Sequence, residues 1–568
     1  MADQKTTQPI ELRFSGAMNN FNTPLDLYLR KKGEVPILRN ADLTLPGIIS
    51  PLKGLLPLNT VPGVDIHSIF VGNGTKFVVD GTTLKYLVAA ALTTVGSLTV
   101  DNKLYWAQAG NWIFIANDTD KKAIYIPGPT LCSWGLAIPT VAPTVTDSGV
   151  AGNPDGTYSC YYRYRITLPD GTIVFTALSP VGSVTVVTNK ISWSVSAYPT
   201  FTGATSVKID LFRTSASMSG NYLVTTLSSP TTTYTDDLTD AALQLLTAYD
   251  ETGYYPPPTG AKIVKYYAAA DRIFVTVGGD AYWSEAGQYH TFLYDAATAE
   301  YSNVNSVFLS GESITAIKRI DENLYLGSLG TWRRLRGRSP SDWTWEDTMA
   351  AMGPINDESA VETPWGIIHP GIDGTMWLFT GNTSRSILDE FIFSTHPSTA
   401  AHATFDGRFY RLYYEDTDFP ELVVDFLKYP SVPPRIVQSS RTATASFYDK
   451  ATGKFYTADA SYLRNGDDPD DSVALTIWTP DIPMAELLKF GNRSVLNYKA
   501  NTQGEDMAIT PYADDVALAP ITINTVTDKR DRTSLPLGDA YTLSLLISIT
   551  SALAITIEEP WLIAKDEG

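Results

Sequence analysis

Cysteine and histidine are scarce in this 568-residue sequence, which contains two cysteines and five histidines. Cys132 and Cys160 form no Cys-x-x-Cys motif, so the sequence predicts neither a disulfide framework nor a zinc site, and we expect two buried free thiols. The histidines lack a His-Glu-x-x-His motif and close ligand spacing. They are His67, His290, His369, His396 and His402. Core or surface roles are therefore favoured over a metal site, also for the pair His396 and His402 in one Pro/Ser/Ala segment, and no cofactor is predicted.

Positive charge is also in short supply. Lysine and arginine total 42 against 61 acidic residues, which gives a net charge of -19 and a pI near 4.7. This balance argues against a surface that grips the phosphate backbone, because such binding needs a basic face. An acidic wall can still face DNA without binding it, although solubility alone also explains the balance. The one local basic cluster, residues 528–538, is interpreted as a solvated loop.

Long uninterrupted apolar runs, which membrane-spanning helices require, are missing. Residues 87–100 are too few and contain Thr and Gly, and residues 541–558 alternate on either side of Thr550-Ser551. That alternation predicts a final β-hairpin. The first ten residues lack the charged and then apolar pattern of a signal peptide. We therefore expect synthesis in a cytoplasm, without Sec export or membrane insertion.

Residues that favour β structure are abundant, and they are arranged as short hairpins. Aromatic residues make up 11% of the chain, including 31 tyrosines and 12 tryptophans. Alternating segments flank Asp-Gly, Gly-Gly or Gly-Asn turns, which accept the positive φ angles of tight hairpins. The clearest copies lie at residues 76–86, 102–115, 272–283, 323–332 and 403–413. Because one hairpin cannot bury its apolar face alone, this series predicts radial packing in a β-propeller.

The order of the segments predicts a mainly-β protein of several domains. Residues 1–60, rich in Pro, Gly and Asn, are interpreted as an extended arm that lies on the body or on a neighbour. Propeller blades, six or seven in all, are expected at 61–138 and 251–480. A small β domain is expected at 481–568, with a short helix at 484–490 followed by strands near 494–499, 507–511 and 521–526 and the final hairpin.

Residues 139–250 interrupt the blade pattern. A Pro- and Gly-rich stretch, residues 138–156, is interpreted as a stiff polar connector. Alternating segments follow at 157–174, 182–187, 190–195, 206–214, 222–227 and 233–237. Several short strands at this spacing predict an immunoglobulin-like or fibronectin-III-like sandwich inserted in the propeller. The three prolines after Tyr254-Tyr255 mark the return to the main body.

The order of parts also resembles a known family. The arm carries Phe14-Ser-Gly-Ala-Met-Asn-Asn-Phe-Asn-Thr and leads to Leu45-Pro-Gly and Pro51-Leu-Lys-Gly. Pro256-Pro-Pro precedes a hairpin that ends in Tyr282-Trp-Ser-Glu, and Arg532-Thr-Ser-Leu-Pro precedes the last apolar segment. In these features the chain resembles the β-propeller virion proteins of tailed bacteriophages, which include tail nozzle and packaged-DNA stabilisation proteins.

The resemblance implies a structural role in a virion assembled in the host cytoplasm. Such a protein is a subunit of a ring, commonly a hexamer, that continues the channel of the portal and adaptor proteins, retains packaged DNA and gates its ejection. Double-stranded DNA would pass without sequence-specific binding, and the inserted sandwich would contact tail fibres, spikes or neighbouring subunits. The family has no catalytic residues to transfer, so no enzymatic activity is expected.

An enzyme remains the principal alternative, since propellers also host glycosidases. Pairs such as Glu358/Glu362 or Asp389/Glu390 can in principle supply an acid and a base, although such pairs also occur by chance among 61 acids. Asp373-Gly374 is better explained as a hairpin turn than as part of a sialidase box. Ser284 lacks a Gly-x-Ser-x-Gly elbow, and nucleophilic catalysis has no support.

Two further features leave a binding role open. The acidic run at residues 465–472 can offer oxygen ligands to Ca²⁺, but it lacks the EF-hand order and is interpreted as a solvated loop. Six tryptophans fit blade packing and sugar stacking equally well. They are Trp106, Trp112, Trp283, Trp343, Trp345 and Trp377. The alternative function is thus a carbohydrate-binding or carbohydrate-cleaving propeller at a host contact, and convergent carboxylates at the propeller centre would favour it.

Overall fold

The computed structural model is nearly all β, with antiparallel pairing dominant. It describes residues 10–12, 37–42, 48–51, 53–216, 218–249, 254–295, 300–308, 311–337, 339–388, 391, 393, 395–427, 429–431, 434–472, 475–478, 482–483, 494–501, 507–513, 516–523, 529–535, 542–549 and 556–565. Within these ranges the one helix is α2(Asp240–Leu243), and no described helix is long and apolar enough to cross a membrane.

Seven successive antiparallel sheets make up the body. The first contains β6(Ile66–Gly72), β7(Thr75–Asp80), β8(Thr83–Val88) and β9(Ala91–Ser97), and the second β10(Tyr105–Ala109), β11(Trp112–Ala116), β12(Lys121–Tyr125) and β13(Thr130–Ser133). The third contains β22(Tyr254–Tyr255), β23(Val264–Tyr267), β24(Arg272–Val277), β25(Asp280–Glu285), β26(Gln288–Asp295), β27(Glu300–Tyr301) and β28(Val304–Ser306).

The remaining four sheets follow in chain order. The fourth contains β29(Ala316–Ile320), β30(Asn323–Gly327), β31(Trp332–Arg336) and β32(Thr344–Asp347), and the fifth β33(Val361–Thr363), β34(Gly366–Pro370), β35(Met376–Phe379) and β36(Ser384–Ser386). The sixth begins with β37(His402–Phe405), β38(Phe409–Tyr413), β39(Glu421–Asp425) and β40(Arg435–Ser439), and the seventh contains β41(Ala445–Asp449), β42(Lys454–Ala458), β43(Leu463–Ser472) and β5(Lys53–Pro57).

The turns inside these sheets match the sequence pattern. β7 and β8 pair around Gly81, which has a φ of 56°, and β10 and β11 pair around Gly110 at 58°. Gly278 joins β24 to β25 with the same positive φ, a conformation that costs a glycine little. The predicted hairpins near residues 76–86, 102–115 and 272–283 are therefore confirmed.

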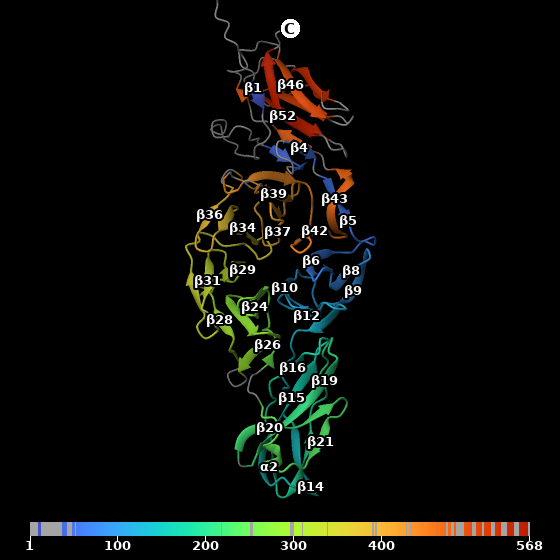
Figure 1. The fold of residues 1–568 in the computed structure, drawn as a ribbon, viewed down its shortest axis with the longest axis vertical. Helices are drawn as coiled ribbons and strands as arrows, with labels where there is room; N and C mark the ends of the chain where they lie inside the picture. The colour runs from blue at the N-terminus through green and yellow to red at the C-terminus, as the bar shows by residue number, and fades with distance from the viewer. Residues whose placement is uncertain are drawn as a thin grey trace, which may run out of the picture.

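The seven sheets follow one another round the centre of the body (Figure 1). The first strands of neighbouring sheets pack together, where the first strand of the third sheet is taken as β23 because β22 has only two residues. Their order is β10, β23, β29, β33, β37, β41 and β6. The series returns to its start, because the backbone N–H of Leu104, just before β10, donates to Oγ of Ser68 on β6 at 3.1 Å. The start of the chain also takes part, since β5 completes the seventh sheet beside β43.

Both ends of the chain form further strands on one side of the body. β2(Ile37–Arg39) continues the sixth sheet from β40 to β44(Leu475–Trp478), and the same sheet includes β45(Ile482–Pro483), β47(Met507–Ala513), β48(Val516–Ala517), β49(Ile521–Ile523) and β51(Thr542–Ile549). A separate sheet contains β1(Ile10–Leu12), β3(Ala41–Asp42), β4(Ile48–Pro51), β46(Ser494–Asn501), β50(Lys529–Leu535) and β52(Thr556–Lys565). The helix predicted at 484–490 lies outside the described residues.

Three sequence predictions about these segments are wrong. β51 pairs with β44 and β47 whereas β52 pairs with β46, so the described strands form no final hairpin. Alternation reveals a strand but not its partner, and Thr550-Ser551 lacks the Gly or Asn that favours a tight turn. The basic segment at residues 528–538 and the acidic run at residues 465–472 are not loops, because most of their residues belong to β50 and β43. Both strands pair with segments that are distant in the sequence, and a charged segment carries no local signal for such pairing.

The insertion consists of two antiparallel sheets. One contains β14(Thr144–Ala151), β18(Asn189–Ser194) and β21(Thr233–Asp236), and the other β15(Gly156–Thr167), β16(Ile173–Phe175), β17(Gly182–Val186), β19(Ser206–Ser215) and β20(Met218–Ser228). The connector predicted at 138–156 is wrong in part, since β14 pairs with β18. β14 is mostly exposed, and its register shifts around Gly149. Its Gly and Ser residues interrupt the apolar–polar alternation by which a strand is predicted from sequence.

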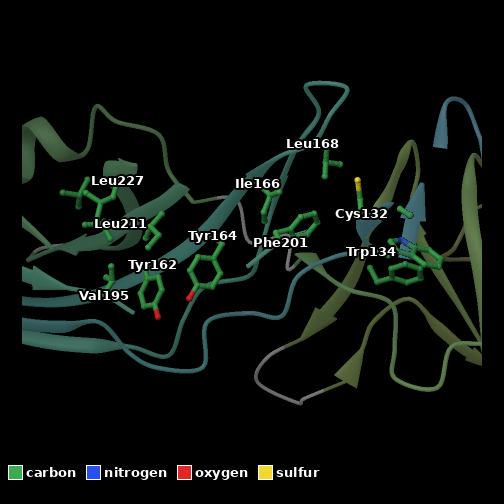
Figure 2. Close-up of a cluster of buried hydrophobic side chains, with 14 of the residues drawn as sticks. Cys132, Trp134, Tyr162, Tyr164, Ile166, Leu168, Val195, Phe201, Leu211 and Leu227 are labelled. Atoms are coloured by element: carbon green, nitrogen blue, oxygen red, sulfur yellow. The ribbon is translucent and has the colours of Figure 1, made fainter. Parts of the chain in front are cut away.

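The insertion shares a hydrophobic core with the body. Figure 2 shows this core running from Leu211 and Tyr162 between the two sheets to Phe201 and then to Cys132 and Trp134 of the body. The contact is tight, because the backbone N–H of Ser133 donates to the carbonyl of Thr202 at 3.1 Å. The insertion is therefore packed against the body rather than tethered by a linker.

Candidate functional site

A cavity of about 260 Å³ lies where the first strands of the seven sheets meet. Each sheet contributes to its lining, with Ser68, Tyr105, Lys265, Lys318, Glu362, Ala403 and Ser446 coming from the first strands of sheets one to seven in that order. Because successive first strands pack side by side, residues far apart in sequence come together here. A second pocket, which Leu136, Phe201 and His290 help to line, is much smaller, at about 10 Å³.

Three ion pairs involve carboxylates that line the cavity. Lys103 Nζ lies 3.1 Å from Glu358 Oε2, and Lys265 Nζ lies 2.6 Å from Glu362 Oε1. Lys318 Nζ lies 2.9 Å from Asp357 Oδ2. Lys265 and Lys318 belong to the third and fourth sheets, and Lys103 lies two residues before β10 of the second sheet, outside the cavity lining. Asp357 and Glu358 precede the fifth sheet and Glu362 lies in its strand β33, so the pairs connect neighbouring parts of the body.

The segment that carries the three carboxylates is held by its own hydrogen bonds. Nδ2 of Asn356 donates to the carbonyl of Ala401 at 2.6 Å, and Oδ1 of Asn356 accepts from the backbone N–H of Ser359 at 2.7 Å. The Tyr410 hydroxyl donates to the carbonyl of Ser359 at 2.9 Å. Because Asn356 and Ser359 are buried, these bonds fix the direction in which the neighbouring carboxylates point.

Backbone donors from the fourth sheet complete the carboxylate contacts. The N–H of Ile317 donates to Asp357 Oδ1 at 2.9 Å, and the N–H of Arg319 donates to Glu362 Oε1 at 2.8 Å. Hydrogen bonds to an ionised carboxylate favour the charged form. The fourth and fifth sheets are thus joined at this point by both backbone donors and lysine side chains.

The two glutamates respond in opposite ways to this environment. Burial opposes the ionisation of Glu362, but Lys265 and Lys318 outweigh it and lower the pKa of Glu362 to about 2. For Glu358 burial is the larger effect and raises its pKa above the ordinary value, even though Lys103 acts against it. Two carboxyl groups in one cavity therefore differ in their tendency to hold a proton.

Two further titratable groups of the cavity, His402 and Tyr105, stay neutral around pH 7. Burial, with help from the charge of Lys103, lowers the pKa of His402 to about 3. Its ring nitrogens lie 3.0 Å from Ser446 Oγ and 3.0 Å from the carbonyl of Ala443. Burial and the nearby charge of Glu358 raise the pKa of Tyr105. His402 therefore acts as a hydrogen-bonded contact between the sixth and seventh sheets.

The lining combines charge with aromatic surface. Trp106 packs edge-on against Phe447 with ring centroids 5.3 Å apart, and Phe405 and Tyr448 also line the cavity. Lys450, which directly follows β41, is exposed and is the third lysine in the cavity lining, beside Lys265 and Lys318. Ammonium groups donate, carboxylates accept and aromatic faces offer apolar contact, so the arrangement suits a small polar ligand.

The structure brings together only one of the predicted pairs of acids. Glu358 and Glu362 both line the cavity, whereas Asp389 and Glu390 lie outside the described residues. Ser284 is fully buried, where its Oγ accepts from the N–H of Ile273 and donates to the carbonyl of Glu285, so it is structural. Asp373-Gly374 is a turn between β34 and β35, with Asp373 Oδ1 accepting from the N–H of Thr375, as predicted.

The remaining predicted residues have packing roles. Cys132 and Cys160 are buried free thiols, as expected. Histidines 290, 369 and 402 are buried, and the described residues contain no group of three metal-binding side chains. Trp112, Trp283 and Trp343 are buried between sheets, in agreement with blade-type packing. The lysines of the cavity were missed, because an isolated lysine at the start of a strand carries no sequence signal.

Comparison with known proteins does not identify the chain. No protein-family model and no curated protein matches the sequence. Among solved structures, the computationally designed protein Ika8 matches with a TM-score of 0.36 and 9% identity, over 73% of this chain and 100% of its own. PorZ, a surface component of the type-IX secretion system of Porphyromonas gingivalis, matches with a TM-score of 0.26 and 10% identity, over 90% and 100%.

A third similar structure is the extracellular domain of a one-component system protein, BT4673, from B. thetaiotaomicron. It matches with a TM-score of 0.21 and 8% identity, over 100% of this chain and 98% of its own. At these scores none of the three similarities bears on the function of the chain.

Proposed function

We propose that the seven sheets form a seven-bladed β-propeller, interrupted by an immunoglobulin-like or fibronectin-III-like sandwich and followed by a small terminal β domain. The contacts between successive first strands support a radial arrangement around the central cavity. Pairing of β5 with β43 supports a closed ring, because the last sheet is completed by residues that precede the first one. The two facing sheets of residues 144–236 support the sandwich.

We propose that the protein is a structural virion component of a bacteriophage tail, a nozzle or hub ring subunit that retains packaged DNA and gates its ejection. The observation that carries this proposal is the elongated layout: the insertion and the terminal strands extend from opposite sides of the body along the long axis of the molecule (Figure 1). Such a subunit offers one end to a portal or adaptor ring and the other to fibres, spikes or neighbouring subunits.

The charge of the chain fits passage of DNA rather than its capture. With a net charge of -19 the surface repels phosphates, whereas each lysine or arginine contact with the backbone would add affinity through counterion release. The cavity at the centre of the body is only about 260 Å³, and the Lys265–Glu362 and Lys318–Asp357 ion pairs line it. A DNA channel therefore lies between subunits of the ring, not along the axis of a single chain.

The experiment that tests the tail role is the mass and negative-stain appearance of the purified chain, alone and after mixing with portal or adaptor rings. The expected result is a ring, commonly sixfold, or ordered docking on the axis of the portal. Portal rings mixed with the heat-unfolded chain serve as the control. A stable monomer that does not dock onto either ring contradicts the proposal.

A second candidate function is carbohydrate binding or cleavage at a host contact, and the convergence of Glu358 and Glu362 favours it. In this reading Glu358, with its raised pKa, is the proton donor and Glu362, with its pKa lowered to about 2, is the base or nucleophile. The close contact between Glu362 and Lys265 counts against it, because a base held by an ammonium group is a weak one.

Hydrolysis of host surface polysaccharides by the wild-type chain and by Glu358→Gln and Glu362→Gln variants tests this candidate. Glu346→Gln, an exposed acid on β32, is the matched control. Cleavage by the wild type and the control that is lost in both cavity variants supports the enzyme. Equal product release by all four proteins, or by none, rejects it.

A further inference from the structure

The central cavity contains as many cations as anions, in a protein that is strongly acidic overall. Lys265, Lys318 and Lys450 line it together with three carboxylates, and a fourth lysine, Lys103, lies outside the lining but pairs with Glu358. Three of the lysines are paired with those carboxylates. Lys450 is exposed and forms no hydrogen bond or ion pair with any residue that the structure describes. The cavity therefore has one cation left to meet a negative charge.

The paired groups also keep capacity for a ligand. Glu358 keeps 23% of its side chain accessible, and in the Lys265–Glu362 pair 27% and 26% of the two side chains remain accessible. An ammonium group has three N–H donors and a carboxylate has several lone pairs, so one contact between them leaves both with unused positions. Hydroxyl groups, which donate and accept, are the ligand atoms that suit such a mixed lining.

The shape and the apolar part of the lining limit the ligand further. Trp106 and Phe447, in edge-on contact, place aromatic surface beside the charged groups. Aromatic side chains stack against the C–H faces of small cyclic molecules and leave the polar edges free for hydrogen bonds. A volume of about 260 Å³ accommodates a molecule of about the size of one sugar ring, not a polymer.

We propose that the central cavity binds a small polyhydroxylated monoanion of the size of an acidic monosaccharide, with Lys450 contacting its anionic group and with Glu358 and the Lys265–Glu362 pair contacting its hydroxyls. The inference rests on the site of the second candidate function but requires no cleavage. It goes beyond the tail role, which is tested by ring formation and docking and does not depend on a ligand in this cavity.

Isothermal titration calorimetry with three probes tests the proposal. D-glucuronate carries both hydroxyls and a negative charge, D-glucose carries only the hydroxyls, and inorganic phosphate carries only the charge. Wild type is compared with Lys450→Met and with Lys454→Met, an exposed lysine on β42 that does not line the cavity. The expected result for wild type is a millimolar-range affinity for glucuronate that exceeds the affinities for glucose and phosphate by about tenfold.

The variants decide where the probe binds. Lys450→Met is expected to weaken glucuronate binding by about tenfold and to leave glucose binding unchanged, whereas Lys454→Met changes neither. No detectable binding of glucuronate to wild type overturns the proposal, as does equal weakening by both substitutions. Phosphate binding as tight as glucuronate binding overturns it too, because the cavity would then select an inorganic anion. Each of these results leaves the ring and docking experiment unaffected.

Discussion

Asn59 and Leu463 are 404 positions apart in the chain, yet Oδ1 of Asn59 accepts a hydrogen bond from the backbone N–H of Leu463 at 2.8 Å. The amide group of the same side chain donates to the carbonyls of Val61 at 2.7 Å and Ser461 at 3.3 Å. Asn59 lies two residues after the end of β5 and is 2% exposed. One buried side chain therefore holds the start of the first sheet to the end of the seventh.

We expect Asn59→Ala to lower the free energy of unfolding by about 2 kcal/mol, because the buried N–H of Leu463 loses its acceptor. Urea unfolding followed by tryptophan fluorescence measures the change. Asn189→Ala is the matched control, since Asn189 donates one exposed hydrogen bond to Asp147. Equal losses in the two variants would show that Asn59 has no special part in closing the body.

The inserted sandwich depends on one buried arginine. Arg213 is fully buried, and its guanidinium donates to Asp236 at 2.6 Å, to Asp240 at 3.0 Å and to the carbonyl of Leu238 at 2.7 Å. Asp236 is fully buried as well. The arginine thus connects β19 to β21 and to the start of α2, and its ion pair with Asp236 is fully out of water whereas Asp240 remains 25% accessible.

Arg213→Met is expected to destabilise the insertion by about 3–5 kcal/mol, because Asp236 would remain buried without its cation. Thermal unfolding followed by near-ultraviolet circular dichroism, to which the sandwich tyrosines contribute, measures the loss. Arg336→Met, which breaks an exposed pair with Glu346, is expected to leave the melting temperature unchanged. A fully stable Arg213→Met protein would mean that the sandwich core alone holds the insertion.

Local structure could be predicted from the sequence wherever the signal is local. Gly81 and Gly110 identify their hairpins because the turn residues and both strands lie within a dozen positions. β14 and β50 were missed for the opposite reason, since their partners β18 and β46 are distant and their own alternation is weak. Backbone pairing with these distant strands stabilises β14 and β50, and the residues of the two strands give no sequence signal for that pairing.

The candidate site shows the same division. Glu358 and Glu362 stand out as neighbouring acids, but the lysines that determine their chemistry come from other sheets. Lys103 lies 255 positions from Glu358, and Lys265 lies 97 positions from Glu362. Only the packing of first strands against one another brings these charges together, so the opposite pKa shifts could not be foreseen from spacing.

Both cysteines are expected to be unreactive in the folded protein. Cys132 and Cys160 are fully buried, and burial raises the pKa of each thiol to about 12. At pH 8 only about one thiol in ten thousand is then ionised, and the thiolate is the reacting form. DTNB should therefore release no thionitrobenzoate from the native chain and two equivalents per chain in concentrated urea, one for each cysteine. Rapid reaction of one thiol in the native protein would indicate that the contact between insertion and body opens.

His290 is expected to make the stability of the protein decrease in acid. Both of its ring nitrogens are buried without a hydrogen-bond partner, and the ring contacts Trp112 and Phe114 edge-on. Burial lowers the pKa of His290 to about 4, and the nearby charge of Asp170 offsets this only in part. Below a pH of about 6.5 the unfolded chain takes up a proton that the folded chain does not, so the free energy of unfolding falls as the pH decreases towards 4.

Replacing His290 by Phe should remove this one contribution. Between pH 7 and pH 5 each such histidine lowers the free energy of unfolding by about 2 kcal/mol. His369 and His402 act in the same direction, because their pKa values are also lowered, to about 4 and about 3. On going from pH 7 to pH 5, the free energy of unfolding of the His290→Phe variant is therefore expected to fall by about 2 kcal/mol less than that of wild type, as measured by urea unfolding. At pH 7 the variant should lose no stability, because no hydrogen bond is removed. His396→Phe, at an exposed position, controls for the added apolar ring. Equal losses of stability in His290→Phe and wild type would mean that the His290 ring is protonated or reaches water in the folded chain. The contact between the insertion and the body would then be less tight than the packing around Trp112 indicates.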